Sequence, residues 1–185
     1  MDITVVLVPG FGDSSSLHWQ SFLERKYVNV VRVQQRDWFS PVREEWIESI
    51  DNTLKQISGK IILVGHSCGA IAIAQWAELH PVSRRIEGSL LVAPADVDSP
   101  YAMDEIKVQR PLPVSMLPFK AVMVCSDDDP HMSLDKSHAI AEVWGCPLVV
   151  LEKAGHVNAD SGYGDWLQCE TLIESFSEMS VLKSR

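Results

Sequence analysis

The 185-residue chain has little positive charge. Its 16 Lys and Arg residues stand against 25 Asp and Glu residues, which gives a formal net charge of -9 at pH 7. Because nucleic-acid binding relies on clustered basic side chains that contact phosphates, this balance argues against a nucleic-acid partner. The first residues, from Met1 to Val8, carry no basic leader, and their apolar run stops at Pro9. We therefore expect a first strand there, not a signal peptide or a membrane span, and a cytoplasmic protein with no membrane partner.

Cysteine is also scarce. The four cysteines, at positions 68, 125, 146 and 169, show neither a C-x-x-C pair nor the Cys/His spacing of a zinc site. We expect reduced thiols, no disulfide framework and no metal. The glycine-rich stretch after the first apolar run lacks both G-x-G-x-x-G and G-K-[ST], the patterns of phosphate-binding loops, so we expect no nucleotide and no other cofactor.

Short apolar runs alternate with amphipathic stretches along the whole chain, and no repeat or linker interrupts them. This alternation is typical of a parallel sheet covered by helices on both faces. We predict an α/β protein, a three-layer α/β/α sandwich with a mostly parallel sheet of about six strands, in a single domain over residues 1–185. The candidate strands are Ile3 to Val8, Val28 to Val33, Lys60 to Val64, Gly88 to Val92, Ala121 to Cys125 and Leu148 to Leu151.

Two helix predictions depend on local signals. Ser40 followed by Pro41 indicates an N-cap and a first-turn proline, and apolar residues then recur at helical spacing to Ile57. The last helix is predicted from about Trp166 to Leu182. Both helices are expected to contribute core contacts.

The stretch from Pro94 to Pro118 differs from the rest of the chain. It contains five of the ten prolines and has no clean periodicity. A long loop beside a sheet edge is often functional, so residues 94–118 are either a lid or an ordered surface connection. The chain leaves too little sequence for a large helical cap.

Gly65-His66-Ser67-Cys68-Gly69 lies between an apolar run, residues 60–64, and a small-residue run, residues 70–77. A G-x-S-x-G pattern between a strand and a helix is typical of the nucleophile elbow of hydrolases. The two glycines leave room for a tight turn, which would hold the Ser67 hydroxyl at the carboxyl edge of the sheet. The pattern predicts that Ser67 is a catalytic nucleophile.

A serine nucleophile needs a base and an acid behind that base. His156 follows the strand candidate that ends at Leu151, and so would reach the same sheet edge as Ser67. The acid is expected in the Asp127-Asp128-Asp129 turn; we favour Asp129, which precedes Pro130, and Asp128 is the alternative. The chain order Ser, Asp, His is the one that α/β-hydrolases use.

An oxyanion hole requires two main-chain N–H groups. We expect one from Cys68, at the start of its helix, and one from Phe11, with Gly12 as the alternate. The Cys68 side chain is expected to fill space, but a thiol at a helix N-terminus can have a lowered pKa, so we also predict that oxidation or alkylation there would slow the enzyme. The possible pocket residues are Gly10, Gly12, His18, His66, His131 and Asn158.

Motifs throughout the chain carry a resemblance to a known family. They are Pro9-Gly10-Phe11-Gly12, Leu17-His18-Trp19, Gln35-Arg36-Asp37-Trp38, Pro41, Trp46, Gly65-His66-Ser67-Cys68-Gly69, Leu91-Val92-Ala93-Pro94-Ala95-Asp96, Leu117-Pro118-Phe119, Ser126-Asp127-Asp128-Asp129-Pro130, Trp144-Gly145 and Gly155-His156-Val157-Asn158-Ala159-Asp160-Ser161-Gly162-Tyr163-Gly164-Asp165-Trp166. The chain resembles the compact serine hydrolases similar to YdeN and retinoblastoma-binding protein 9, in the α/β-hydrolase superfamily. It departs from their pattern at Cys68, where leucine is common, and at His131, where an aromatic residue is common.

The resemblance implies a capless domain with Ser67, Asp129 and His156 as a triad and esterase-type hydrolysis of a small-molecule acyl substrate. From the residues themselves we expect a serine hydrolase that forms a covalent acyl-enzyme, with thioesters or amides as possible alternatives to esters. The hypothesis from another class is a non-catalytic interaction scaffold that keeps a hydrolase fold. The sequence gives no indication of a protein partner.

Overall fold

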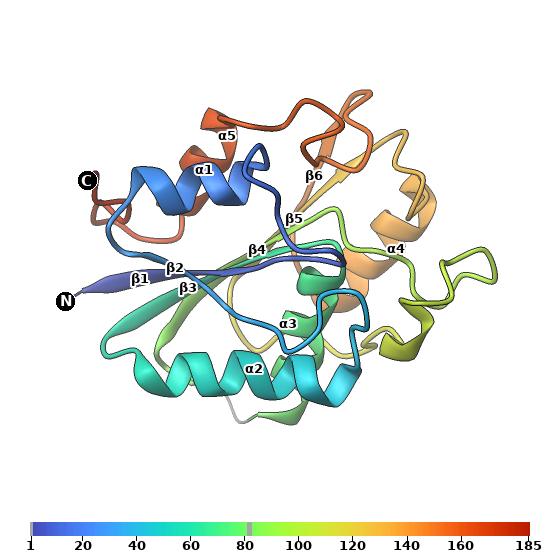
Figure 1. Ribbon diagram of the computed structural model, residues 1–185, viewed down its shortest axis with the longest axis horizontal. Helices are drawn as coiled ribbons and strands as arrows, with labels where there is room; N and C mark the ends of the chain where they lie inside the picture. Colours follow the sequence, from blue (N-terminus) through green and yellow to red (C-terminus); the bar gives the residue numbers. More distant parts are fainter. Residues whose placement is uncertain (1, 81–82) are drawn as a thin grey trace.

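The computed structural model describes residues 2–80 and 83–185, and its centre is a six-stranded parallel sheet (Figure 1). The strands are β1 (Ile3–Val8), β2 (Val30–Arg32), β3 (Lys60–His66), β4 (Ile86–Val92), β5 (Ala121–Ser126) and β6 (Leu148–Leu151). They lie in the order β2-β1-β3-β4-β5-β6, and each neighbouring pair is parallel. The predicted parallel sheet is therefore confirmed.

Helices cover both faces of the sheet. They are α1 (Trp19–Lys26), α2 (Arg43–Gln56), α3 (Cys68–Leu79), α4 (Leu134–Trp144) and α5 (Leu167–Glu174), with a short 3-10 turn, η1 (Lys107–Gln109). Helices α2 and α3 lie on one face of the sheet, and α1 and α5 lie on the other (Figure 1). Side chains of α2, α3 and α4 pack in one hydrophobic cluster, and side chains of α1 and α5 pack in the other. The three-layer α/β/α arrangement is as predicted.

Strand β1 shows how the sequence builds two cores. Val6 and Val8 belong to the cluster beneath α2 and α3, whereas Val5 and Leu7 belong to the cluster beneath α1 and α5. Because successive side chains of a strand point to opposite faces, a continuous apolar run is what a sheet covered on both faces requires. All four side chains are fully buried.

The predicted start of α2 is two residues too early. The helix begins at Arg43 and its N-cap is Val42, which offers no side-chain cap. Pro41 lies outside the first turn, because the N–H of Val42 bonds back to the carbonyl of Ser40 in a local turn. The N-cap prediction at Ser40 is wrong.

The predicted last helix is too long. α5 ends at Glu174, and its carboxylate accepts hydrogen bonds from the main-chain N–H groups of Val181 and Leu182, both at 2.8 Å. The chain therefore folds back where continued helix was expected. It then pairs with the segment before β2: the N–H of Val28 donates to the carbonyl of Lys183 at 2.8 Å, so β2 is shorter than predicted.

The carboxyl ends of β1, β3, β5 and β6 meet at one edge of the sheet, where the segments with the predicted functional residues follow (Figure 1). In the part of the chain that the structure describes, no helix is both long enough and apolar enough to cross a bilayer.

Candidate active site

Ser67 occupies a strained turn between β3 and α3. Its φ of 53° and ψ of -122° lie in a region that side chains rarely adopt. The turn needs small neighbours: a Cβ at Gly65 would stand 2.7 Å from the Cα of Ala70, and one at Gly69 would collide with the carbonyl of Val8. The predicted elbow geometry is present, and Ser67 lies at the carboxyl edge of the sheet.

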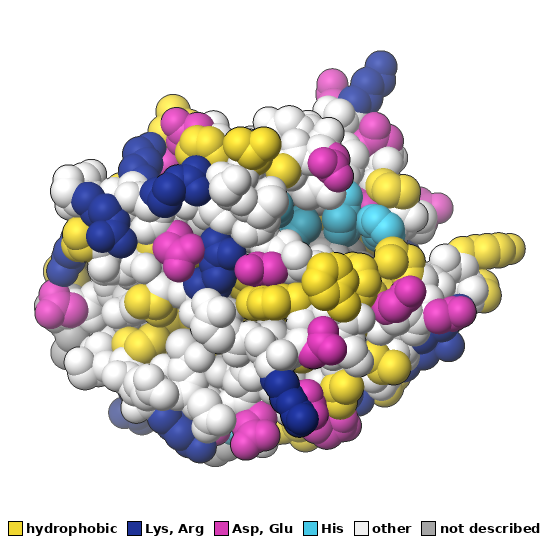
Figure 2. All heavy atoms as spheres, in the orientation of Figure 1, with side chains coloured by type: hydrophobic (Ala, Val, Ile, Leu, Met, Phe, Trp, Pro, Cys, Tyr) yellow, Lys and Arg dark blue, Asp and Glu magenta, His cyan; other side chains and the backbone are white. Residues whose placement is uncertain are grey.

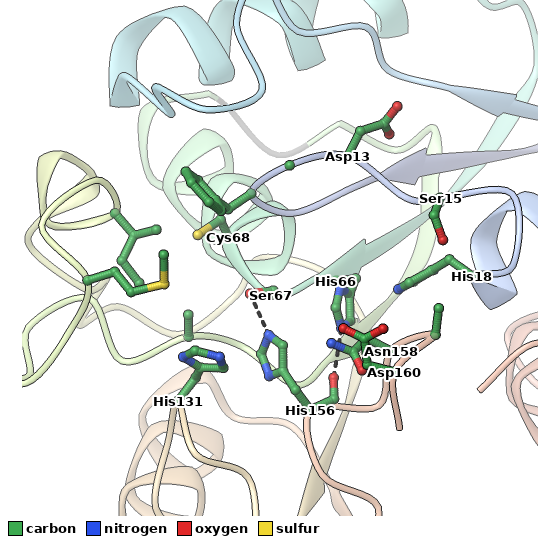
Figure 3. A pocket seen from close by; sticks show the side chains of 16 residues that line it. Asp13, Ser15, His18, His66, Ser67, Cys68, His131, His156, Asn158 and Asp160 are labelled. Atoms are coloured by element: carbon green, nitrogen blue, oxygen red, sulfur yellow. Dashed lines mark hydrogen bonds between the residues drawn. The ribbon is translucent and has the colours of Figure 1, made fainter. Parts of the chain in front are cut away.

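The structure brings Ser67, His156 and Asp129 together. Nε2 of His156 lies 2.8 Å from Oγ of Ser67 (Figure 3), and Nδ1 lies 3.0 and 2.9 Å from the two carboxylate oxygens of Asp129. The Asp129 side chain is 2% exposed and that of His156 is 11% exposed. A carboxylate accepts only, so Nδ1 carries the proton and Nε2 is left free to accept the proton of the serine hydroxyl.

Asp128, the alternative acid, faces the main chain of the loop that precedes His156. Its Oδ1 accepts hydrogen bonds from the hydroxyl of Ser126 at 2.6 Å and from the N–H of Gly155 at 2.7 Å. The Ser126 hydroxyl, and then the Gly155 N–H, lower the pKa of Asp128. Its carboxylate makes no hydrogen bond to the His156 ring, so the geometry favours Asp129 as the partner of the base.

The main chain around His156 is held by groups that the sequence reasoning did not assign to it. The N–H of His156 donates to Oγ of Ser161 at 3.2 Å, and that hydroxyl donates to Oδ1 of Asn158 at 2.9 Å. From α1, the indole N–H of Trp19 donates to the carbonyl of Val157 at 2.9 Å. Nothing in local sequence pattern indicates this last contact, because 138 residues separate its two ends.

A cavity of about 330 Å³ opens beside the Ser67–His156 pair. Figure 2 shows histidine side chains in a hollow on this face, next to hydrophobic side chains. Gly10 does not line it, contrary to expectation: it lies behind the elbow, where an added Cβ would stand 2.9 Å from Cβ of Ser67. The lining residues expected from sequence are Phe11, Gly12, His18, His66, Ser67, Cys68, His131, His156 and Asn158; those not expected are Asp13, Ser15, Ala95, Met103, Ile106, Ala159 and Asp160.

Burial keeps three of the pocket histidines neutral. It lowers the pKa of His18 to about 3, with Arg32 and His156 acting in the same direction, and lowers the pKa of His66 well below its ordinary value. Burial likewise lowers the pKa of His131. These imidazoles therefore add no positive charge beside His156, and the rings of His18 and His66 each make a hydrogen bond to the main chain.

Cys68 does not have the lowered pKa that its position suggested. Burial raises the pKa of its thiol to about 12, and the main-chain amide of Phe11 and the Ser67 side chain only partly oppose the shift. All four cysteines are buried free thiols. Within residues 2–80 and 83–185, no three His, Cys, Asp or Glu side chains are grouped as metal ligands.

The stretch 94–118 is tied together at its two ends. The Arg110 guanidinium donates to the carbonyls of Val97 and Ser99 at 2.6 and 2.8 Å, and the N–H of Leu112 donates to Oδ2 of Asp98 at 3.0 Å. The enclosed segment extends Met103 and Ile106 to the cavity wall. The segment therefore forms one side of the pocket, and these hydrogen bonds join its two ends.

A parallel sheet in this order, helices on both faces and a serine on a strained strand-to-helix turn together define an α/β-hydrolase fold without a large cap. Solved structures agree. A YdeN-like hydrolase from Pectobacterium atrosepticum SCRI1043 is 33% identical, with 97% of this chain and 93% of that chain covered and a TM-score of 0.85. The YdeN protein of Bacillus subtilis is 16% identical, with 95% and 98% covered and a TM-score of 0.79. Carboxylesterase CesB of Bacillus subtilis, 12% identical with 95% and 83% covered and a TM-score of 0.65, shares the fold.

The family model described as serine hydrolase matches residues 5–175. The chain belongs to this serine hydrolase family, and that membership supports hydrolase activity. Comparison with curated protein sequences gave no match.

Proposed function

We propose that this protein hydrolyses esters of small carboxylic acids through a Ser67, His156 and Asp129 triad and a covalent acyl-enzyme. The observation that carries the proposal is the continuous hydrogen-bonded line from Asp129 through both ring nitrogens of His156 to the Ser67 hydroxyl. Activating a serine hydroxyl requires this arrangement, whereas a non-catalytic scaffold has no use for it.

The reaction proceeds in two steps. Oγ of Ser67 attacks the ester carbonyl while Nε2 of His156 takes the hydroxyl proton, and the imidazolium then gives that proton to the departing alkoxide, which leaves as the alcohol. Water attacks the acyl-enzyme in the second step, loses a proton to His156, and releases the carboxylic acid as the Ser67 hydroxyl is restored. Asp129 stabilises the imidazolium and keeps Nδ1 protonated throughout.

We assign the oxyanion hole to the main-chain N–H groups of Cys68 and Phe11. Cys68 begins α3, so its N–H has no partner within the helix and the helix dipole favours negative charge there. Phe11 follows β1 and lines the cavity together with Ser67 and Cys68, which supports its N–H as the second donor. Gly10 permits this approach, since a Cβ there would stand 3.4 Å from the Cys68 nitrogen and closer to Ser67.

The cavity supports a small acyl substrate. Its volume of about 330 Å³ is near the lower end of small-molecule sites. Phe11, Met103 and Ile106 supply apolar walls, which suit a short acyl chain. A carboxylesterase and an esterase are among the structural neighbours, which agrees with an ester as the substrate class, and a type II thioesterase is also among them.

The test is active-site labelling combined with ester turnover. The purified protein is treated with a fluorophosphonate probe, and p-nitrophenyl acetate and butyrate are assayed in parallel. We expect the probe on Ser67 and turnover of both esters, with both signals lost in Ser67→Ala and greatly slowed in His156→Ala. His138→Ala, at an exposed position of α4, is the matched control for loss of an imidazole. Folded wild-type protein that neither reacts nor turns over ester would favour the scaffold hypothesis.

A further inference from the structure

His66 directly precedes Ser67, and its ring packs against the rings of His18, Trp19 and His156 and makes one hydrogen bond. Nε2 of His66 lies 2.9 Å from the main-chain carbonyl oxygen of His156, and Figure 3 draws this bond as a dashed line. A carbonyl oxygen only accepts, so Nε2 carries the hydrogen and donates it. The side chain is 6% exposed, and burial lowers the pKa of His66 well below its ordinary value, so the ring is neutral and Nδ1 has no hydrogen.

We propose that His66 is a positioning residue for the base, whose Nε2–H holds the main chain of His156 at the distance at which its ring meets Ser67. The proposal rests on the proposed function, because it concerns how that triad is assembled. His66 is the first variable residue of the G-x-S-x-G motif, and its proposed role is separate from the formation of the turn.

The topology explains why such a contact is needed. Ser67 follows β3 and His156 follows β6, and two strands, β4 and β5, separate β3 from β6 in the sheet. The other anchors of the His156 loop come from elsewhere: Asp129 follows β5, and Trp19 belongs to α1. Two hydrogen bonds join His156 to the end of β3 and the turn after it. One links the His156 ring to Ser67, and the other links the His156 carbonyl to the ring of His66.

The same contact indicates that His66 affects the position of His156 and not the binding of substrate. The one N–H of the neutral His66 ring is already used, so His66 has no hydrogen to donate to a bound ester. Losing the bond should shift the His156 ring relative to Oγ of Ser67, and a displacement of about 1 Å can slow an enzyme by roughly 100-fold. We therefore expect the loss in kcat and little change in KM.

Two variants of similar polarity test the proposal. In His66→Gln the side-chain amide nitrogen reaches about as far as Nε2 of histidine and can donate to the same carbonyl, whereas in His66→Asn the amide is one methylene too short. We expect H66Q to retain kcat within about threefold and H66N to lose roughly 30- to 100-fold, each with KM for p-nitrophenyl butyrate within about threefold of wild type. His138→Asn is the control, since His138 is exposed on α4. Equal kcat values for H66Q and H66N, or a loss confined to KM, would overturn the proposal.

A second measurement observes the ring tautomer in the wild-type protein and uses H66Q only to assign the resonances of His66. Nitrogen-15 NMR of the histidine-labelled wild-type protein distinguishes the two neutral ring tautomers. We expect the resonances that disappear in H66Q to report a neutral ring protonated at Nε2. A ring protonated at Nδ1 would overturn the assignment even if H66N failed to fold.

The outcomes separate the two proposals. Wild-type protein that neither hydrolyses ester nor reacts with fluorophosphonate contradicts the proposed function, and the role of His66 falls with it. Active wild-type protein with an equally active, folded H66N contradicts the role of His66 alone.

Discussion

Mild acid should destabilise the protein through His18, which caps α1 and lines the cavity. Nδ1 of His18 accepts a hydrogen bond from the N–H of Gln20 at 3.2 Å, and the side chain is 4% exposed. Burial is the largest cause that lowers the pKa of His18 to about 3, and Arg32 and His156 add to it. Protonating His18 would place a charge in the core and remove the acceptor of the cap.

The sign and size follow from proton linkage. An unfolded chain protonates His18 near its ordinary pKa of 6.5, but the folded protein does so only near 3. The unfolded state therefore binds more protons between these values, so the free energy of unfolding falls as the pH falls from about 6.5 toward 3. At about 1.4 kcal/mol per pH unit, His18 alone costs about 2 kcal/mol between pH 7 and pH 5. His66, whose pKa burial also lowers, acts in the same direction.

The assay compares His18→Asn with wild type. Asparagine is a good N-cap and keeps an acceptor for the Gln20 N–H, but it does not titrate. Urea unfolding at pH 7 and pH 5, followed by the fluorescence of the six tryptophans, gives the free energy of unfolding of each protein. Wild type should lose about 2 kcal/mol more than H18N between the two pH values. His138→Asn, at an exposed histidine, should behave as wild type. Equal losses in wild type and H18N would refute the reasoning.

Three further predictions concern the elbow and the acid. Asp129→Asn should lower kcat by about 10³- to 10⁴-fold with Tm little changed, because the ring of His156 loses its orientation and charge stabilisation. Asp128→Ala should lower Tm, because the Gly155 N–H loses its acceptor. The opposite pattern would make Asp128 the acid. Gly65→Ala should cost about 1–3 kcal/mol or more in urea unfolding, since the new methyl would stand 2.7 Å from backbone and side-chain atoms of α3; unchanged stability would contradict this packing. Iodoacetamide at pH 8 should leave Cys68 unmodified in folded protein, as peptide mass spectrometry will show, because burial raises the pKa of its thiol to about 12; rapid modification there would contradict the burial.

Sequence alone was sufficient where a strong local pattern met a strict geometric requirement. β1 and β6 have the predicted bounds. The tight turn at Ser67, between a strand and a helix, was predictable because it has room only for glycine at positions 65 and 69. Helix ends were less predictable. α5 ends at Glu174 because its carboxylate binds the returning chain, and a helical pattern in the sequence carries no record of that competing contact.

The pocket wall was predicted only in part, since distant segments build it. Met103 and Ile106 reach the cavity because Arg110 ties the ends of their loop together, and this depends on contacts that sequence spacing does not reveal. Cys68 is buried in a hydrophobic cluster, which agrees with the expectation that its side chain fills space, but its thiol pKa is raised where a lowered one was the second expectation. A helix N-terminus lowers a thiol pKa, but complete burial outweighs it here.

The loop that bears His156 is strained. Lys153, Gly155 and Val157 have φ values of 51°, 55° and 49°, so alternate residues are left-handed, and two of the three carry side chains. Such a conformation costs roughly 1–2 kcal/mol for each residue that is not glycine. The base therefore stays aimed at Ser67 only if surrounding groups hold the loop in this shape.

The run of three aspartates after β5 supplies that hold. Asp127 accepts the main-chain N–H of residue 153 at 2.7 Å, Asp128 accepts that of residue 155 at 2.7 Å, and Asp129 accepts Nδ1 of His156 at 2.9 Å. Each carboxylate thus contacts a different donor in the same loop, and Asp129 alone contacts the ring. Adjacent acidic side chains repel one another, so three neighbouring aspartates need hydrogen-bond donors that offset the repulsion. The left-handed residues of the loop supply main-chain N–H groups as such donors. All three carboxylates therefore hold the loop that bears His156, and Asp129, which contacts the ring, is the one we propose as the acid of the triad.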